Sequence, residues 1–130
     1  MKLVLADWNE GALNQLAQDL PTEVLAVPTD VRDEAAVESL ARAAFERFGQ
    51  VDLVFNNAGV LSSGLTWEID AATWQRSLAV NIGGVVNVIR AFVPRLVAAD
   101  RPARIVNTSS LGGFLTSPFM APYSATKFAI

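Results

Sequence analysis

The stretch Arg104-Ile-Val-Asn-Thr-Ser-Ser-Leu-Gly-Gly113, followed by Ala121-Pro-Tyr-Ser-Ala-Thr-Lys127, decides how this chain is interpreted. Its first part predicts a buried strand over Ile105–Thr108, because a short continuous apolar run bounded by turn residues is typical of a covered strand. The strand ends in two hydroxyls, Ser109 and Ser110, and a glycine pair follows them. The sequence therefore places two hydroxyl side chains at the end of a strand.

The second part predicts the start of a helix that carries a tyrosine and a lysine. Pro122 suits the first helical position, where its missing N–H would have no partner. Tyr123 and Lys127 are then four residues apart on one helix face, where their side chains can interact. A nearby ammonium and the positive helix N-terminus both favour a phenolate, which can act as a general acid or base. Alone, this spacing occurs by chance and would mark only an exposed helix face.

Composition limits the classes of protein that the chain can belong to. The 130 residues fit one domain, and 52% apolar with 18% charged residues is typical of a globular protein. A net charge of −3 without a basic cluster argues against nucleic-acid binding. The absence of Cys and His argues against a disulfide framework and a transition-metal site.

No targeting or membrane segment is expected. Asp7 interrupts the opening apolar run, which is too short for a signal peptide. The longest apolar run, Ile82 to Ile89, contains Asn87 and is followed by Arg90, so it is too short to span a bilayer. We therefore expect a cytoplasmic protein without a membrane or nucleic-acid partner.

Apolar runs and helical patterns alternate along the chain. The predicted strands are Lys2–Asp7, Val24–Val27, Val51–Phe55 and Arg104–Thr108, and the predicted helices run from Asn9 to Pro21, from Asp33 to Gly49 and from about Ala72 to Ala98. This alternation predicts an α/β fold of βαβ units around a parallel sheet. The first strand is expected to be covered on both faces. The long helix is apolar nearly all round, which predicts burial by the sheet and by another subunit.

Polar residues follow the predicted strands, at the edge where ligands of open α/β sheets gather. Asp7 ends the first strand, where an acid can bind the adenosine ribose of NAD, although an ordinary strand-end acid is the plainer interpretation. Asp30-Val31 ends the second strand, and helix-start chemistry explains it about equally well. Asn56-Asn-Ala-Gly59 ends the third, where a small residue and a glycine let a ligand lie against the backbone. Asn81 lies inside an apolar helix, where an amide needs a partner.

Together these residues resemble the short-chain dehydrogenase/reductase family of the classical type, over essentially the whole chain. The matching elements, in the family's order and near its spacing, are Asp7, Asp30-Val31, Asn56-Asn-Ala-Gly59, Val80-Asn81, Ile105-Val-Asn-Thr-Ser-Ser110 and Tyr123-Ser-Ala-Thr-Lys127. The resemblance implies a Rossmann-like doubly wound parallel sheet. It also implies an NAD(P)-dependent oxidoreductase that interconverts an alcohol and a ketone by hydride transfer.

The resemblance also implies roles for particular residues. Tyr123 would exchange a proton with the substrate oxygen, which Ser110 would hold; the family places its serine 13 residues before the tyrosine. Lys127 would bind the nicotinamide ribose and favour the phenolate, and Asn81 would hold a water for proton relay. The cofactor-binding residues implied are Asp7, Asp30, Val31, Asn56, Ala58, Gly59, Tyr123 and Lys127. Asp7 favours NAD over NADP, because its charge would repel the 2′-phosphate.

The sequence departs from the family pattern at both ends. The dinucleotide fold places a glycine-rich turn roughly 20 residues before the ribose-binding acid, yet only six residues precede Asp7. In the strand order 3-2-1-4-5-6 the strand before that turn is the central one. Residues 1–130 are therefore expected to be a piece of a longer protein and to form a partial dinucleotide-binding domain. The sheet of this partial domain is expected to lack its central first strand and its last strands.

Several alternatives remain open at this stage. One alternative to an active oxidoreductase is a relative that keeps the fold for cofactor sensing. Another is an inactive fragment that only interacts with a homologue. A third is a sugar-nucleotide epimerase, which shares Tyr-x-x-x-Lys. The complete protein is expected to be a dimer or tetramer, because the family packs the long helix against its copy. Its partner would be a small alcohol or ketone, whose identity the sequence does not specify.

Overall fold

The computed structural model describes residues 1–130, and strands and helices alternate through most of them. The elements are β1 (Leu3–Asp7), α1 (Glu10–Asp19), β2 (Val24–Pro28), α2 (Glu34–Phe48), β3 (Leu53–Asn56), α3 (Ala71–Leu78), a π-helical segment η1 (Ala79–Gly83), α4 (Gly84–Ala98), β4 (Arg104–Asn107), a 3-10 turn η2 (Leu111–Gly113) and α5 (Ala121–Ala129). The predicted α/β class is confirmed, and most strand limits differ from the prediction by one or two residues.

Capping residues explain where the helices begin and end. The side chain of Asn9 accepts from the backbone N–H of Ala12 at the start of α1, and Asp33 accepts from two N–H groups at the start of α2. Asp70 accepts from the backbone N–H of Thr73 at the start of α3. These side chains satisfy helix N–H groups that have no partner within the helix. Gly49 ends α2 with φ of 74°, a left-handed conformation that favours glycine.

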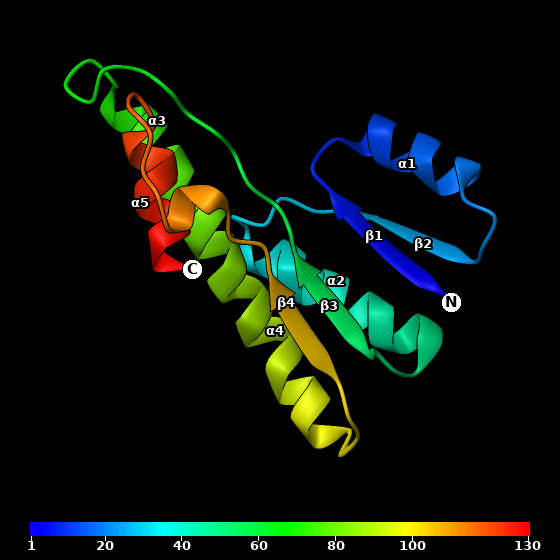
Figure 1. Cartoon of the computed structure of the whole chain (residues 1–130). Helices are drawn as coiled ribbons and strands as arrows, with labels where there is room; N and C mark the ends of the chain where they lie inside the picture. The colour runs from blue at the N-terminus through cyan, green and yellow to red at the C-terminus, as the bar shows by residue number, and fades with distance from the viewer.

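The strands form two separate parallel pairs rather than one sheet. β1 pairs with β2, with Leu3 opposite Val24, and β3 pairs with β4, with Leu53 opposite Arg104. Figure 1 shows the two pairs as separate bodies, and β1 and β3 belong to different sheets. This partial sheet agrees with the expected doubly wound fold from which the central strand is missing.

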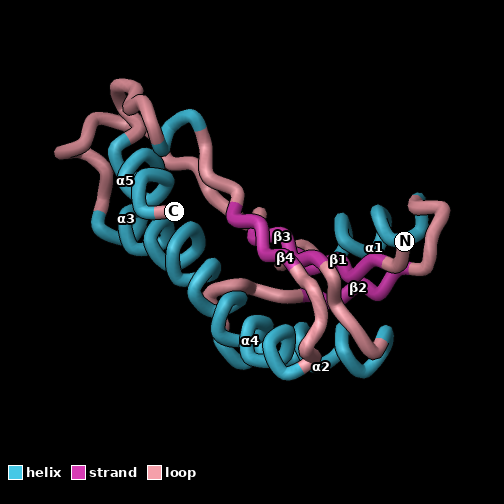
Figure 2. Tube along the Cα trace, turned by 60° about the horizontal axis from the view of Figure 1, so that its bottom comes forward, coloured by secondary structure: helices cyan, strands magenta, loops and turns pink.

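Helices cover the strands from two sides. Figure 2 shows α1 over one face of the β1–β2 pair, with α2 and α4 packed on the opposite side of the strands. The core lies between α2, α4 and β3, and its buried members are Val37, Leu40, Ala41, Ala44, Val54, Val88, Ala91 and Phe92. Arg95 pairs with Glu38 and Arg90 with Glu34, so two ion pairs also join α2 to α4.

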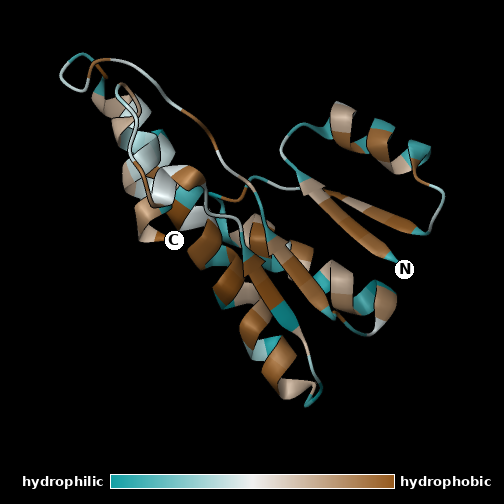
Figure 3. Ribbon diagram, in the orientation of Figure 1, coloured by the Kyte–Doolittle hydropathy of each residue, from teal (hydrophilic) through white to brown (hydrophobic).

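The expectation that the first strand is covered on both faces is wrong in degree, because no residue of β1 is buried. The second pair is also open: Val54 is buried, whereas Leu53 and Phe55 on the other face of β3 are 44% and 63% exposed. Figure 3 shows hydrophobic colour along these strands. The sequence pattern of a covered strand is thus present on strands that residues 1–130 cover only in part.

The long helix differs from the predicted single α-helix over Ala72–Ala98. It begins at Ala71, and its α-helical hydrogen bonding is interrupted by the π-helical segment Ala79–Gly83 around Asn81. Such π-bulges occur frequently at functional sites. One face of the helix packs in the core, while Leu78, Val86, Ile89 and Val97 remain exposed. The chain itself therefore covers only part of its apolar circumference.

By length and composition alone, the 28-residue helix Ala71–Ala98 could cross a membrane. The sequence expectation considered only the run Ile82 to Ile89 and was too narrow in this respect. A core helix of a soluble protein meets the same criterion, so one such helix is weak evidence for a membrane span.

The open strand edges predict self-association of residues 1–130. Unpaired N–H and C=O groups on β1 and β3 are templates for strands of other chains, and exposed Phe55 adds an apolar surface. Light scattering of the purified chain is expected to report oligomers or aggregates, and Phe55→Lys is expected to lower the associated fraction. A monodisperse monomer would contradict this expectation.

Candidate active site

The two hydroxyls after β4 serve different purposes. The hydroxyl of Ser109 donates to the backbone carbonyl of Lys127 at 2.9 Å, so it holds α5 against the strand end. The Ser110 Oγ accepts from the backbone N–H of Gly112 at 3.1 Å. A serine hydroxyl has one proton of its own, and that of Ser110 has no acceptor within the chain. Ser110 is therefore the serine whose proton is available to a ligand.

Ser110 and Tyr123 lie on either side of Gly112. A Cβ placed on Gly112 would be 3.2 Å from Cε1 of Tyr123 and 3.6 Å from the Ser110 Oγ. Both side chains therefore reach one point, and a larger residue at Gly112 would press on the tyrosine ring. The phenol hydroxyl of Tyr123 makes no hydrogen bond within the chain, although its ring is half-buried. The predicted serine and tyrosine are thus brought together.

Lys127 lies one helical turn after Tyr123, as the spacing predicts. Its Nζ is 5.8 Å from the centroid of the Tyr123 ring and donates to the backbone carbonyl of Thr108 at 2.6 Å. An ammonium has three protons, so two remain for other acceptors. The residue is only 6% exposed. A buried lysine with uncommitted protons is costly to desolvate, which is typical of a lysine that binds a polar ligand.

Gly59 brings the third strand end to the same place. A Cβ on Gly59 would lie 3.5 Å from Oδ1 of Asn81 and 3.7 Å from Nζ of Lys127. The glycine therefore leaves the lysine ammonium and the backbone of the Asn56–Gly59 loop close to one another. The four side chains predicted as catalytic, Asn81, Ser110, Tyr123 and Lys127, all gather around the ends of β3 and β4.

The Asn81 amide is buried and fully engaged. Its Oδ1 accepts from the backbone N–H of Val60 at 2.8 Å, and its Nδ2 donates to the Val60 carbonyl at 3.0 Å and to Oγ1 of Thr126 at 2.9 Å. The amide thus clamps the loop after β3 onto the π-helical segment. Both of its protons are used within the protein, so its side chain has no N–H left for a water.

Asn56 and its neighbours form the loop after β3. Nδ2 of Asn56 donates to Oδ1 of Asn107 at 2.9 Å, which ties the ends of β3 and β4 together. Asn56 is buried, whereas Ala58 and Gly59 are exposed. The buried Asn56 amide therefore joins β3 to β4, and the exposed Ala58 and Gly59 are the part of the motif that a ligand can reach.

The predicted adenosine-side residues lie at the ends of β1 and β2. Asp7 is exposed, and its Oδ1 accepts from the backbone N–H of Asn9 at 2.8 Å. Asp30 forms an ion pair with Arg32, whose side-chain hydrogen bonds hold the pKa of the Asp30 carboxyl below its ordinary value. The Val31 carbonyl accepts from Nδ2 of Asn87 at 2.9 Å. Asp30 and Val31 thus have internal partners, and Asp7 is the freer of the two carboxylates.

Sequence reasoning missed three features of this site: the π-helical segment, the role of Ser109 as a support for Lys127, and Thr126. Thr126 is completely buried between Asn81 and the backbone of Tyr123. The one signal for Thr126 in the sequence was its position between Tyr123 and Lys127. Its partner lies 45 residues away, so spacing alone could not indicate the contact.

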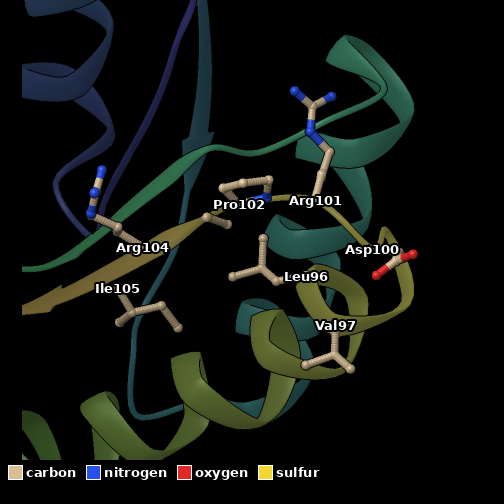
Figure 4. Close-up of a pocket in the computed structure, with 8 residues that line it drawn as sticks. Leu96, Val97, Asp100, Arg101, Pro102, Arg104 and Ile105 are labelled. Carbon is tan, nitrogen blue, oxygen red and sulfur yellow. The ribbon is translucent and has the colours of Figure 1, made fainter.

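A separate hollow of the structure lies elsewhere. It measures about 450 Å³ and is lined by the last turn of α4 and the start of β4, with Leu96, Arg101, Pro102 and Ile105 among its walls (Figure 4). This is the opposite end of β4 from Ser109 and Ser110. Arg101 is already paired with Asp52. The hollow contains none of the residues predicted as a site.

Ser110 after β4, Tyr123 and Lys127 on α5 and the buried Asn81 gather at one edge of a parallel α/β fold. This is the arrangement that the resemblance implies for an oxidoreductase with a dinucleotide-binding fold. The comparison with known proteins agrees: the family model described as short chain dehydrogenase matches residues 1–130. The chain belongs to the short chain dehydrogenase family.

The similar proteins include dehydrogenases and reductases. A 1-deoxy-11-beta-hydroxypentalenate dehydrogenase of Streptomyces arenae is 42% identical over 98% of this chain and 47% of its own length. A CLA biosynthesis dehydrogenase/reductase of Lactiplantibacillus plantarum is 36% identical over 99% of the chain and 46% of its own length. The crystal structure of a short chain dehydrogenase/reductase from Burkholderia phymatum in complex with NAD has 46% identity and a TM-score of 0.97, covering 99% of this chain and 47% of that one. The chain spans about half the length of the curated relatives it matches.

Proposed function

We propose that residues 1–130 form part of a dinucleotide-binding domain of an NAD-dependent oxidoreductase that interconverts an alcohol and a ketone. The observation that carries the proposal is the set of uncommitted protons on converging side chains. Ser110 retains its hydroxyl proton, Tyr123 its phenol proton, and Lys127 two ammonium protons, all within the cluster around Gly59 and Gly112. A structural hydrogen-bond network would use these protons internally.

Each of these side chains has a chemical task in the proposal. Ser110 donates to the substrate oxygen and holds it, and Tyr123 gives its proton to that oxygen or takes one from it. Lys127 binds ribose hydroxyls and places positive charge beside the phenol. Asn81 fixes the loop after β3, and any water it holds would be bound by its backbone carbonyl, because its amide protons are used.

The residues present fit NAD on the adenosine and nicotinamide-ribose sides. Gly59 leaves the backbone open next to the Lys127 ammonium, and the exposed carboxylate of Asp7 suits ribose hydroxyls. Asn56, Ala58 and Gly59 would line the adenosine side, with Asp30 and Val31 next to it. When bound, the nicotinamide accepts or donates the hydride. The complex of the Burkholderia phymatum relative with NAD supports this choice of cofactor.

The wider assignments follow from the same proposal. The substrate is a small-molecule alcohol or ketone, and we expect a cytoplasmic homo-oligomer, a dimer or tetramer. The exposed apolar residues of the long helix, Leu78, Val86, Ile89 and Val97, would be covered in that oligomer. By itself the chain is expected to bind NAD only weakly, because none of its strand-to-helix turns has the glycine-rich pattern that binds a pyrophosphate.

A chimera tests the proposal. Residues 1–130 would replace the matching segment of the Streptomyces arenae dehydrogenase, which supplies the other half of the polypeptide. NADH formation from 1-deoxy-11-beta-hydroxypentalenate is then followed by absorbance. If the proposal holds, the chimera forms NADH. A folded chimera that binds NAD but forms no NADH, while the parent enzyme does, would contradict it.

Cofactor choice is expected to depend on Asp7. In the chimera, NAD should bind more tightly than NADP, because the Asp7 carboxylate would repel a 2′-phosphate and residue 8 is Trp rather than a cation. Asp7→Ser should lower the ratio of the NADP Kd to the NAD Kd at least ~10-fold, which corresponds to the loss of about 1.4 kcal/mol of charge repulsion. Calorimetric titration with both cofactors measures this. Asp19→Ser, an exposed acid at the far end of α1, is the matched control.

A further inference from the structure

Thr126 lies inside the motif that carries Tyr123 and Lys127, yet none of its surface reaches solvent. Its hydroxyl donates to the backbone carbonyl of Tyr123 at 2.7 Å and accepts from Nδ2 of Asn81 at 2.9 Å. Both directions are determined, because a carbonyl can only accept and an amide nitrogen can only donate. The single proton of the hydroxyl and one of its lone pairs are therefore committed to different segments of the chain.

The partner amide extends the connection to a third segment. Asn81 holds both the N–H and the carbonyl of Val60, the residue next to Gly59. Gly59 in turn lies next to both Asn81 and the Lys127 ammonium, since a Cβ on it would be within 3.7 Å of each. The hydroxyl of Thr126 thus links α5, the π-helical segment and the loop after β3.

We propose that Thr126 is a positioning residue, whose hydroxyl sets the location of Tyr123 and Lys127 relative to the Asn56–Gly59 loop. Without it, Asn81 keeps a buried N–H that has no acceptor, and the amide must rotate or take in water to satisfy it. Rotation of the amide breaks its two hydrogen bonds with Val60 and so releases that residue. The effect of Thr126 on turnover rests on the proposed function, whereas its hydrogen-bonded link to Asn81 and Val60 does not.

Hydrogen exchange of the whole chain, read by mass spectrometry, tests the link directly and tolerates self-association. The variants are Thr126→Val, which keeps the shape but loses the hydroxyl, and Thr126→Ser, which keeps the hydroxyl. Thr29→Val is the matched control, since Thr29 is also a buried threonine with an internal hydrogen bond, at the end of β2. Thr126→Val is expected to speed exchange of the Val60 peptide at least ~10-fold, whereas Thr126→Ser and Thr29→Val leave it within ~2-fold of the original chain.

Several outcomes would overturn the proposal. These are an unprotected Val60 peptide in the original chain, unchanged protection in Thr126→Val, or equal loss in Thr29→Val. If Thr126→Val does not fold, Thr126→Ser decides, because loss of Val60 protection there would mean that packing rather than the hydroxyl matters.

Turnover in the chimera is the second measurement. There Thr126→Val is expected to lower kcat at least ~10-fold with KM changed less than ~3-fold, and Thr126→Ser is expected to restore it. A positioning role predicts that rescue, whereas a purely structural loss would lower the active fraction in proportion to unfolding. An inactive parent chimera together with the expected exchange pattern would contradict the proposed function and leave the Thr126 link standing.

Discussion

Replacement of Tyr123 by phenylalanine is expected to lower turnover of the chimera at least ~10²-fold, the usual contribution of a positioned general acid or base. The substitution keeps the ring against Gly112 and removes only the phenol oxygen, which has no internal partner. NAD affinity should therefore change little. Steady-state NADH formation and a calorimetric titration with NAD measure the two quantities.

The same helix offers a matched control for this substitution. Ser124→Ala removes a buried hydroxyl next to Tyr123, and the one contact of that hydroxyl is with Thr116 at 3.4 Å. It should keep turnover within ~3-fold of the chimera, because most substitutions away from the reacting groups act on stability instead. Near-normal turnover of Tyr123→Phe would rule out the proposed proton donor.

Lys127→Met should impair both binding and turnover. Methionine fills the space of the lysine stem but removes the ammonium, which would contact ribose and lies 5.8 Å from the tyrosine ring. Loss of one charge-assisted hydrogen bond, about 1.5–3 kcal/mol, weakens NAD binding at least ~10-fold. Turnover should fall at least ~10²-fold, because the phenolate also loses its positive neighbour. Cofactor titration and NADH formation measure the two effects.

Lys2→Met is the control for the loss of a lysine charge. Lys2 is exposed and pairs with Glu23 at the far end of β1, so its loss should leave NAD affinity and turnover within ~2-fold. If Lys127→Met bound NAD as tightly as the unsubstituted chimera, the ribose contact assigned to Lys127 would be wrong.

Much of the fold could be predicted because its signals are local. Apolar runs ended by Asp7 and Asn56 are strands in the structure, and Asn9, Asp33 and Gly49, which were predicted as helix limits, cap those helices. The break between β1 and β3 was also predictable, since the known strand order leaves the two without a common neighbour.

The rest depends on contacts between distant residues. The π-helical segment forms where Asn81 reaches Val60 and Thr126, which are 21 and 45 residues away. The different roles of Ser109 and Ser110 depend on which hydroxyl donates to the backbone carbonyl of Lys127. A strand pattern also reports what a strand is suited to bury, so it could not indicate that Phe55 is uncovered here.

Transfer of deuterium tests most directly whether these residues perform hydride chemistry. The chimera is given NAD and a substrate labelled with deuterium on its carbinol carbon, and the NADH formed is weighed by mass spectrometry. We expect the label to appear in NADH, and the Tyr123→Phe chimera to form labelled NADH at least ~10²-fold more slowly. A folded chimera that binds NAD, yet yields no labelled NADH where the parent enzyme does, would contradict the assignment of these residues to the reaction.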